Sequence, residues 1–142
     1  MQANPEPQQI KEDDPDFVKA LGILQAFMTK HIAVASGRGD KTVSFRLHYV
    51  PAFTAWWFGD GGYYTICEEW WFLNQARPNA DKDGRRAFSD AIARKTAEHF
   101  KQTLGYESRI FDCDGLIKNW FVNVTFYLTR DEEGTKTVVV HI

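Results

Sequence analysis

The stretch Trp56–Phe72 reads WWFGDGGYYTICEEWWF and holds four of the five tryptophans in a chain of 142 residues. Large aromatic side chains each bury about 150–250 Å², so whatever packs against this stretch sets the core. The glycines at positions 59, 61 and 62 favour a flexible turn. We therefore expect a loop or a short strand over residues 52–62, followed by a long strand over residues 63–74.

A pair of carboxylates interrupts the apolar second half of this stretch. Glu68 and Glu69 have apolar neighbours on both sides, and in a strand they would point to opposite faces unless a β-bulge brings both to one side. A carboxylate beside a tryptophan ring is partly desolvated, which raises its pKa toward the range useful for acid–base catalysis. Opposite His48 such a group could transfer a proton. The alternatives are an ion pair with Arg46 or a bulge at a sheet edge.

Two helices are predicted from apolar residues at helical spacing. The first begins with Asp14 as its N-cap and Pro15 at its first position, and Gly37 ends it. The second spans about residues 84–104, and Gly105 stops it. Its outer face is rich in arginine and lysine, which we interpret as a solvated surface.

Strands are predicted where apolar and polar residues alternate. The first covers residues 43–50. In the C-terminal third, residues 107–113 pair with residues 116–130 through a turn at Asp114-Gly115, and a further strand covers residues 136–142. The element order α-β-β-α-β-β-β indicates an α+β fold, in which two helices pack on one face of a five-stranded, mostly antiparallel sheet.

The same alternation separates the two faces of the sheet. Apolar side chains of residues 43–49 and 120–128 share the face that the helices cover. The opposite face carries hydrogen-bonding side chains next to Phe121, namely Arg46, His48, Asn123, Thr125 and Tyr127. Polar groups with an aromatic rim are typical of a small-ligand site, although antiparallel sheets commonly leave one face to water.

Charge limits the classes of function. The formal net charge is −2, of which residues 1–16 contribute −4 and the other 126 residues +2. We expect a disordered acidic tail over residues 1–14 and a single domain over residues 15–142. A net charge of +2 is far from the concentrated basic footprint of a nucleic-acid binder, which argues against nucleic acid as a partner.

Neither a cofactor nor a metal site is predicted. The four histidines are scattered and form no HExxH pattern. Cys67 and Cys113 lack CxxC spacing and lie within predicted strands, which favours inert, buried thiols. No apolar run approaches the roughly 20 residues that cross a bilayer, and the N-terminus does not have the pattern of a signal peptide. We therefore expect a cytoplasmic protein without membrane contact.

The leading hypothesis is a small, soluble, non-enzymatic binding or regulatory protein. Large rings beside a glycine-rich turn are costly to expose unless a partner covers them. We expect another protein to bind the tryptophan-rich loop and the open sheet face. The residues predicted to bind it are Trp56, Trp57, Phe58, Asp60, Tyr63, Arg46 and Asn123.

Other functions stay open. One is a cone-shaped α+β small-ligand carrier or enzyme with an aromatic pocket, in which acid–base chemistry comes from His48, Glu68, Glu69 and Tyr127. Another is the binding of single-stranded nucleic acid by aromatic and basic side chains, although these fall on different predicted elements. The apolar segment Val138–Ile142 favours a homodimer if it lies at a sheet edge.

Overall fold

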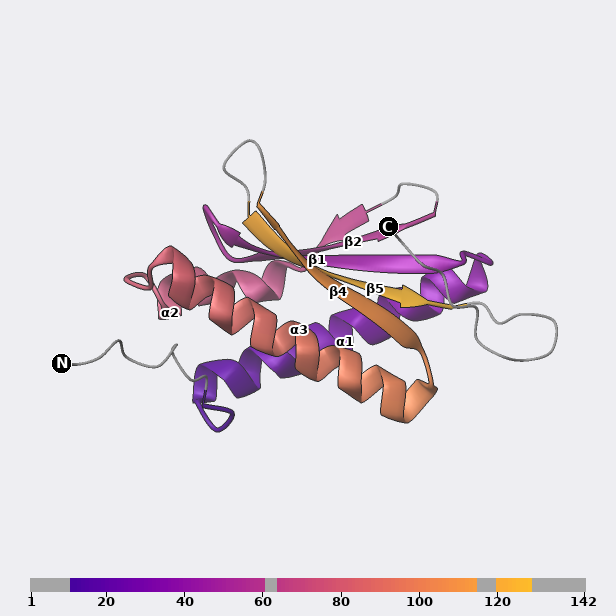
Figure 1. Ribbon diagram of the computed structural model, residues 1–142, viewed down its shortest axis with the longest axis horizontal. Coiled ribbons are helices and arrows are strands. Elements are labelled where there is room, and N and C mark those ends of the chain that lie inside the picture. The colour runs from indigo at the N-terminus through magenta and orange to yellow at the C-terminus, as the bar shows by residue number, and fades with distance from the viewer. Residues whose placement is uncertain (1–10, 61–63, 115–119, 129–142) are drawn as a thin grey trace.

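The computed structural model describes residues 11–60, 64–114 and 120–128 (Figure 1). Within them the predicted α+β fold is confirmed, since two long helices lie on one face of a five-stranded antiparallel sheet with the order β3-β2-β1-β5-β4. Strand β1 is therefore central. The elements are α1 (Pro15–Gly37), β1 (Thr42–Val50), β2 (Thr54–Gly59), β3 (Tyr64–Ile66), the 3-10 helix η1 (Glu68–Phe72), α2 (Leu73–Ala76), α3 (Lys82–Leu104), β4 (Glu107–Asp114) and β5 (Trp120–Tyr127).

Helix α1 begins as its sequence predicts. The Asp14 carboxylate accepts a hydrogen bond from the backbone N–H of Asp16 at 2.9 Å, which satisfies one of the free donors at the helix start. The helix ends at Gly37 as predicted, but the glycine with positive φ, 81°, is Gly39, because Arg38 keeps a helical conformation.

Helix α1 is also the one helix in the described residues that is long and apolar enough, by length and composition alone, to cross a membrane. Core helices of globular proteins meet the same criterion, and one stripe of α1 is buried against the sheet and α3. That stripe consists of Phe17, Ala20, Leu24, Met28, His31, Ile32 and Ala35.

Helix α3 is fixed at both ends by its own sequence. The Asp81 carboxylate accepts a hydrogen bond from the backbone N–H of Gly84 at 2.8 Å, so the helix starts at Lys82, slightly earlier than predicted. Gly105 ends it as predicted, in a left-handed conformation with φ of 74°.

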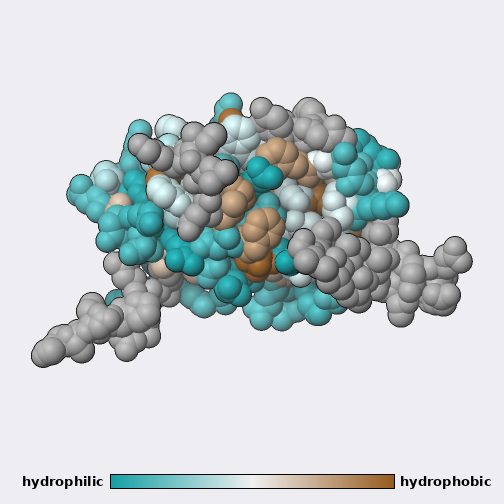
Figure 2. All heavy atoms as spheres, turned by 45° about the horizontal axis from the view of Figure 1, so that its top comes forward, coloured by the Kyte–Doolittle hydropathy of each residue, from teal (hydrophilic) through white to brown (hydrophobic). Residues whose placement is uncertain are grey.

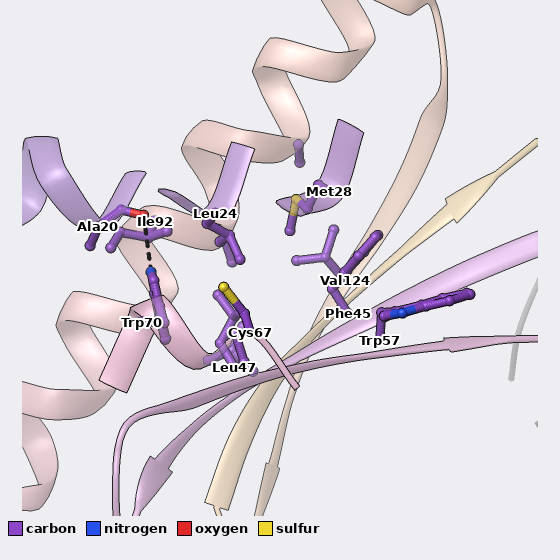
Figure 3. Packing of buried hydrophobic residues seen from close by; sticks show 14 of the residues in the cluster. Ala20, Leu24, Met28, Phe45, Leu47, Trp57, Cys67, Trp70, Ile92 and Val124 are labelled. Carbon is purple, nitrogen blue, oxygen red and sulfur yellow. Dashed lines mark hydrogen bonds between the residues drawn. The ribbon is translucent and has the colours of Figure 1, made fainter. Parts of the chain in front are cut away.

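The hydrophobic core lies between the helices and the sheet (Figure 3). Leu24 and Met28 of α1 and Ile92 of α3 point toward side chains of the three central strands. Burial of a large apolar side chain contributes about 1.5–3 kcal/mol, so this layer supplies most of the stability. The largest fully buried side chains are Trp57, Trp70, Tyr49, Phe17, Phe45, Phe53, Phe88, Phe100 and Phe126.

Trp70 joins the turn after β3 to the first helix. Its ring is fully buried, and its indole Nε1 donates a hydrogen bond of 2.9 Å to the backbone carbonyl of Ala20 (Figure 3). Next to it, the Asn74 side chain accepts from the backbone N–H of Phe53 at 2.8 Å and donates to the carbonyl of Phe53 at 3.0 Å. The loop before β2 therefore gains the hydrogen bonds that a strand partner would otherwise supply.

The tryptophan-rich stretch shows the main departure from the predicted elements. The sequence predicted either a loop or a short strand over residues 52–62, and the structure has a short strand there, β2. The long strand expected over residues 63–74 is wrong, because only β3 is extended there and η1 and α2 follow. In an extended strand Glu68 would share the buried face of Trp70. The turn of η1 buries Trp70 and leaves both Glu68 and Glu69 exposed.

Strands β4 and β5 pair antiparallel as predicted, but the connection between them is longer. Asp114 pairs with Trp120, so residues 115–119 connect the strands and the expected two-residue turn at Asp114-Gly115 is wrong. The strand expected over residues 136–142, and residues 1–10 of the expected acidic tail, lie outside the described residues.

Candidate functional site

One face of the sheet carries no helix in the described part of the chain, since α1 and α3 both lie on the other side (Figure 1). We call it the open face. Figure 2, in which the top of Figure 1 comes forward, shows hydrophobic side chains gathered near the middle of this face with hydrophilic ones around them. The strand register confirms that the five predicted polar residues share it: Arg46 pairs with Asn123, Ser44 with Thr125, Thr42 with Tyr127, and His48 with Phe121.

Arg46 lies at the centre of the open face between two phenyl rings. Its guanidinium carbon is 4.4 Å from the ring centroid of Phe58 on β2 and 4.8 Å from that of Phe121 on β5. Each cation–π contact contributes about 0.5–1 kcal/mol, and more where water is excluded. The Nε of Arg46 is buried and has no hydrogen-bond acceptor among the described residues.

His48 extends this cluster toward β2. Its ring centroid is 5.8 Å from that of Trp56 and 5.0 Å from that of Phe121. Burial, and secondly the positive charge of Arg46, lower the pKa of His48 to about 4. The imidazole is therefore neutral near pH 7 and cannot act there as a cation.

A polar row continues from Arg46 along β5. The hydroxyl oxygens of Ser44 and Thr125 are 2.7 Å apart across the strands, and the Asn123 amide donates to the Thr125 hydroxyl at 2.8 Å. Asn123 is only 3% exposed, although it lies on the face without helices. Beyond it, burial raises the pKa of the Tyr127 phenol, against a smaller opposing effect of Arg109.

These side chains surround an open hollow of about 540 Å³. Its lining combines two arginines and an exposed phenyl ring with neutral polar groups. None of the described lining residues carries a carboxylate, so this part of the lining is positively charged. The lining residues are Thr42, Ser44, Arg46, Arg109, Phe111, Asn123, Thr125 and Tyr127.

Two of the residues predicted to bind a partner lie elsewhere. Trp57 is fully buried on the helix-covered face, where its ring stacks on His31 at 4.7 Å; as neighbours in a strand, Trp56 and Trp57 must face opposite sides. Asp60 is exposed, but its carboxylate accepts hydrogen bonds from the backbone N–H of Lys41 at 2.6 Å and the Thr42 hydroxyl at 3.0 Å, which lower its pKa. Asp60 therefore links the end of β2 to the start of β1. Tyr63 lies outside the described residues.

The structure does not bring together the four residues predicted to supply acid–base chemistry. Glu68 and Glu69 line a separate groove of about 710 Å³ between α1 and β3, which also contains Lys30. His48 contacts the rings of Trp56 and Phe121 on the open face. Among the described residues, neither glutamate forms the alternative ion pair with Arg46. Phe121 pairs with His48, and Tyr127 lies six positions further along β5. Six residues span about 20 Å in a strand, so Tyr127 is far from His48.

The sequence-based prediction did not include every residue of the open face. Arg109 and Phe111 join the open face because they pair with Thr125 and Asn123, and the alternation around Ile110 was a usable signal. The contacts of Arg46 with the two rings depend on which strands are neighbours, which the sequence does not specify. In the described residues no three His, Cys, Asp or Glu side chains gather as metal ligands would, and burial raises the pKa of Cys67 to about 11.

Comparisons of the chain with protein-family models, with curated proteins and with solved structures gave no match.

Proposed function

We propose that this chain is a small binding protein without catalytic activity of its own, which holds another protein on the open face of its sheet. The observation that carries the proposal is a group of aromatic rings on that face. Trp56 and Phe58 come from β2, Phe121 from β5 and Phe111 from β4. Phe111 is 44% exposed, so the group reaches the surface.

The composition of this surface supports a protein partner. Aromatic residues and arginine are the types enriched at the centre of protein interfaces and at the positions that dominate binding. Here they stand on strands, whose backbone is fixed by pairing on both sides of β1. A rigid aromatic platform loses little conformational entropy when a partner covers it.

Site-specific cross-linking tests where the partner binds. A photoreactive phenylalanine analogue replaces Phe111 in one protein and Leu104, at the end of α3, in a matched control. The two positions are 44% and 49% exposed, but they lie on different surfaces. In extracts of the source cells we expect one discrete adduct from position 111 and none of that mass from position 104.

Binding of the purified adduct partner then tests the energetics. Truncation of a central interface aromatic commonly weakens binding by about 2 kcal/mol, which is roughly 30-fold. We therefore expect Phe111→Ser to raise the Kd by at least tenfold in calorimetry, with Leu104→Ser unchanged. Equal adducts from both positions, or equal effects of both substitutions, would overturn the proposal.

A small-ligand carrier is the second candidate, and the hollow beside Arg46 is the observation that favours it. Its volume of about 540 Å³ falls within the range of about 300–1,000 Å³ that ligand pockets occupy. Native mass spectrometry of the protein purified from its source tests this candidate. A bound small molecule that Arg46→Gln removes would favour the carrier over the partner-binding protein.

A further inference from the structure

Arg46 differs from four other arginines of the described residues in how its charge is balanced. Arg38, Arg77, Arg86 and Arg94 each form an ion pair with an aspartate. Arg46 forms none in the described part of the chain and contacts two phenyl rings instead. Rings remove water from a guanidinium but accept none of its in-plane hydrogen bonds. Its charge is therefore partly desolvated, and no described residue supplies a counter-ion.

The hollow next to Arg46 supplies further hydrogen-bond donors. The Ser44 and Thr125 hydroxyls and the Asn123 amide line it. The two hydroxyls share one hydrogen bond, so one of their two hydrogens can turn toward a ligand, and the Asn123 amide has a second N–H besides the one that Thr125 accepts. Asn123 is 97% removed from solvent, as its 3% exposure shows, and the Thr125 hydroxyl holds its amide in place. The described lining therefore offers these donors and two arginines, with no acidic side chain among them to repel an anion.

We infer that this hollow is a carboxylate-binding site in which Arg46 is the principal ligand-binding residue. A planar guanidinium matches a carboxylate with two parallel N–H···O bonds, and such charge-assisted bonds are the strong ones in proteins. The hollow is much larger than one carboxylate group, so it also admits the chain that bears it. The origin of the carboxylate rests on the proposed function. If the chain binds another protein, the carboxylate belongs to an aspartate or glutamate side chain of that partner.

Titration with simple carboxylates tests the site without the partner. Sodium acetate and sodium benzoate are added to labelled protein, with sodium chloride at matched ionic strength, while NMR follows the Arg46 Nε–H and the Asn123 side-chain amide. We expect saturable shifts with both carboxylates in the millimolar range and none with chloride. Arg46→Lys, which keeps the charge but loses the forked geometry, weakens binding at least tenfold. Arg94→Lys, on the solvated face of α3, leaves it unchanged.

Several outcomes would overturn the inference. These are equal shifts with chloride, undiminished binding in Arg46→Lys, or inorganic phosphate binding at least tenfold more tightly than acetate. The amide spectrum shows whether Arg46→Lys folds. If it does not fold, the carboxylate site is tested by Thr125→Val and by the comparison of acetate with chloride in the wild type. Thr125→Val removes a hydroxyl from the hollow and is expected to weaken acetate binding at least threefold.

The two proposals fail in different ways. If acetate binds at Arg46 but position 111 cross-links no protein, the site holds and the partner-binding function falls. If a partner binds at position 111 but acetate does not bind, the function holds and the carboxylate site falls. If both hold, benzoate competes with the partner, and the competition is lost in Arg46→Lys.

Discussion

The two faces of β1 use similar residue types for different purposes. On the covered face Phe45 meets other rings, with Phe27 and Phe126 each at 6.0 Å between centroids. One residue along on the open face, Arg46 lies over Phe58 and Phe121. Rings therefore meet rings on one side and a cation on the other.

The two faces of β1 differ in burial and in their charged and polar groups. Every β1 side chain that points to the helices is at most 1% exposed and belongs to the hydrophobic core, and the one hydroxyl among them, on Tyr49, donates to the Asp112 carboxylate. The open face holds a cation without an ion pair among the described residues, a neutral histidine and an exposed phenylalanine. A folded core needs none of these. Their presence on a rigid sheet supports the binding surface that we propose over a merely solvated face.

The two neighbouring tryptophans give the largest test of this comparison. We expect Trp57→Ala to lower the free energy of unfolding by about 3–5 kcal/mol, because it leaves a cavity in the covered layer. Trp56→Ala, on the half-buried open face, should lower it by no more than about 1.5 kcal/mol. Urea unfolding followed by circular dichroism measures both. Similar losses from the two substitutions would show that the open face is also part of the core.

The second test uses pH. The pKa of His48 in the folded protein is about 4, below the ordinary value of 6.5, so between these values the unfolded chain binds more protons. Stability is full above pH 6.5 and falls as the pH drops toward 4. After discounting for solvent screening, we expect a loss of about 1–2 kcal/mol.

Urea unfolding at pH 7 and pH 4.5 measures this loss. In His48→Gln the loss should be smaller by about 1 kcal/mol. Some pH dependence should persist in this variant, since burial and Lys30 also lower the pKa of His31 on the covered side. If the variant and the wild type show the same pH dependence, His48 does not cause the loss of stability and another group does.

A hydrogen bond across the open face gives a smaller effect. Ser44→Ala removes the hydroxyl that lies 2.7 Å from that of Thr125, and a neutral hydrogen bond contributes about 0.5–1.5 kcal/mol. One residue along, Phe45→Ala should cost about 3–5 kcal/mol. A loss for Ser44→Ala above about 2 kcal/mol, in the same urea assay, would contradict a face specialised for binding and not for stability.

The smallest effect is expected on the outer surface of α3. Arg94 pairs with Asp90 at 2.9 Å, and two-thirds of the Arg94 side chain is exposed. Exposed pairs one helical turn apart contribute about 0.3–0.5 kcal/mol, so Arg94→Ala should change stability by no more than that. High salt should abolish the difference between variant and wild type. A larger effect would mean that α3 is not simply solvated on this side.

Much of the fold was predictable because it depends on local periodicity. The alternation over residues 43–50 and 120–128 assigned both faces of β1 and β5 correctly, since the covered side of each strand is apolar throughout and the other side is mostly polar. Residues 54–58 gave no such signal, because β2 carries Trp57 on the covered face and Trp56 and Phe58 on the open one. The glycines after them suggested a loop, although the rings belong to a strand.

The candidate site was predictable in part. Its polar residues on β1 and β5 followed from the same alternation, and Arg46 and Asn123 were named correctly as members of the open face. The order β3-β2-β1-β5-β4 could not be derived, because β5 inserts beside β1 from a distant part of the chain. That insertion brings Phe121 to Arg46. The turn at η1 was also hidden, since it depends on the Trp70 bond to a helix carbonyl.

The back-to-back placement of Trp56 and Trp57 also gives the molecule two natural optical reporters. Trp57 stacks on the His31 ring in a dry layer, whereas Trp56 lies by His48 on the opposite side. Indole emission shifts and is quenched according to its immediate surroundings. A variant in which Trp57 is the only tryptophan left would therefore report by fluorescence on unfolding. A variant that keeps only Trp56 would change its emission wavelength when the outer side of the sheet is covered.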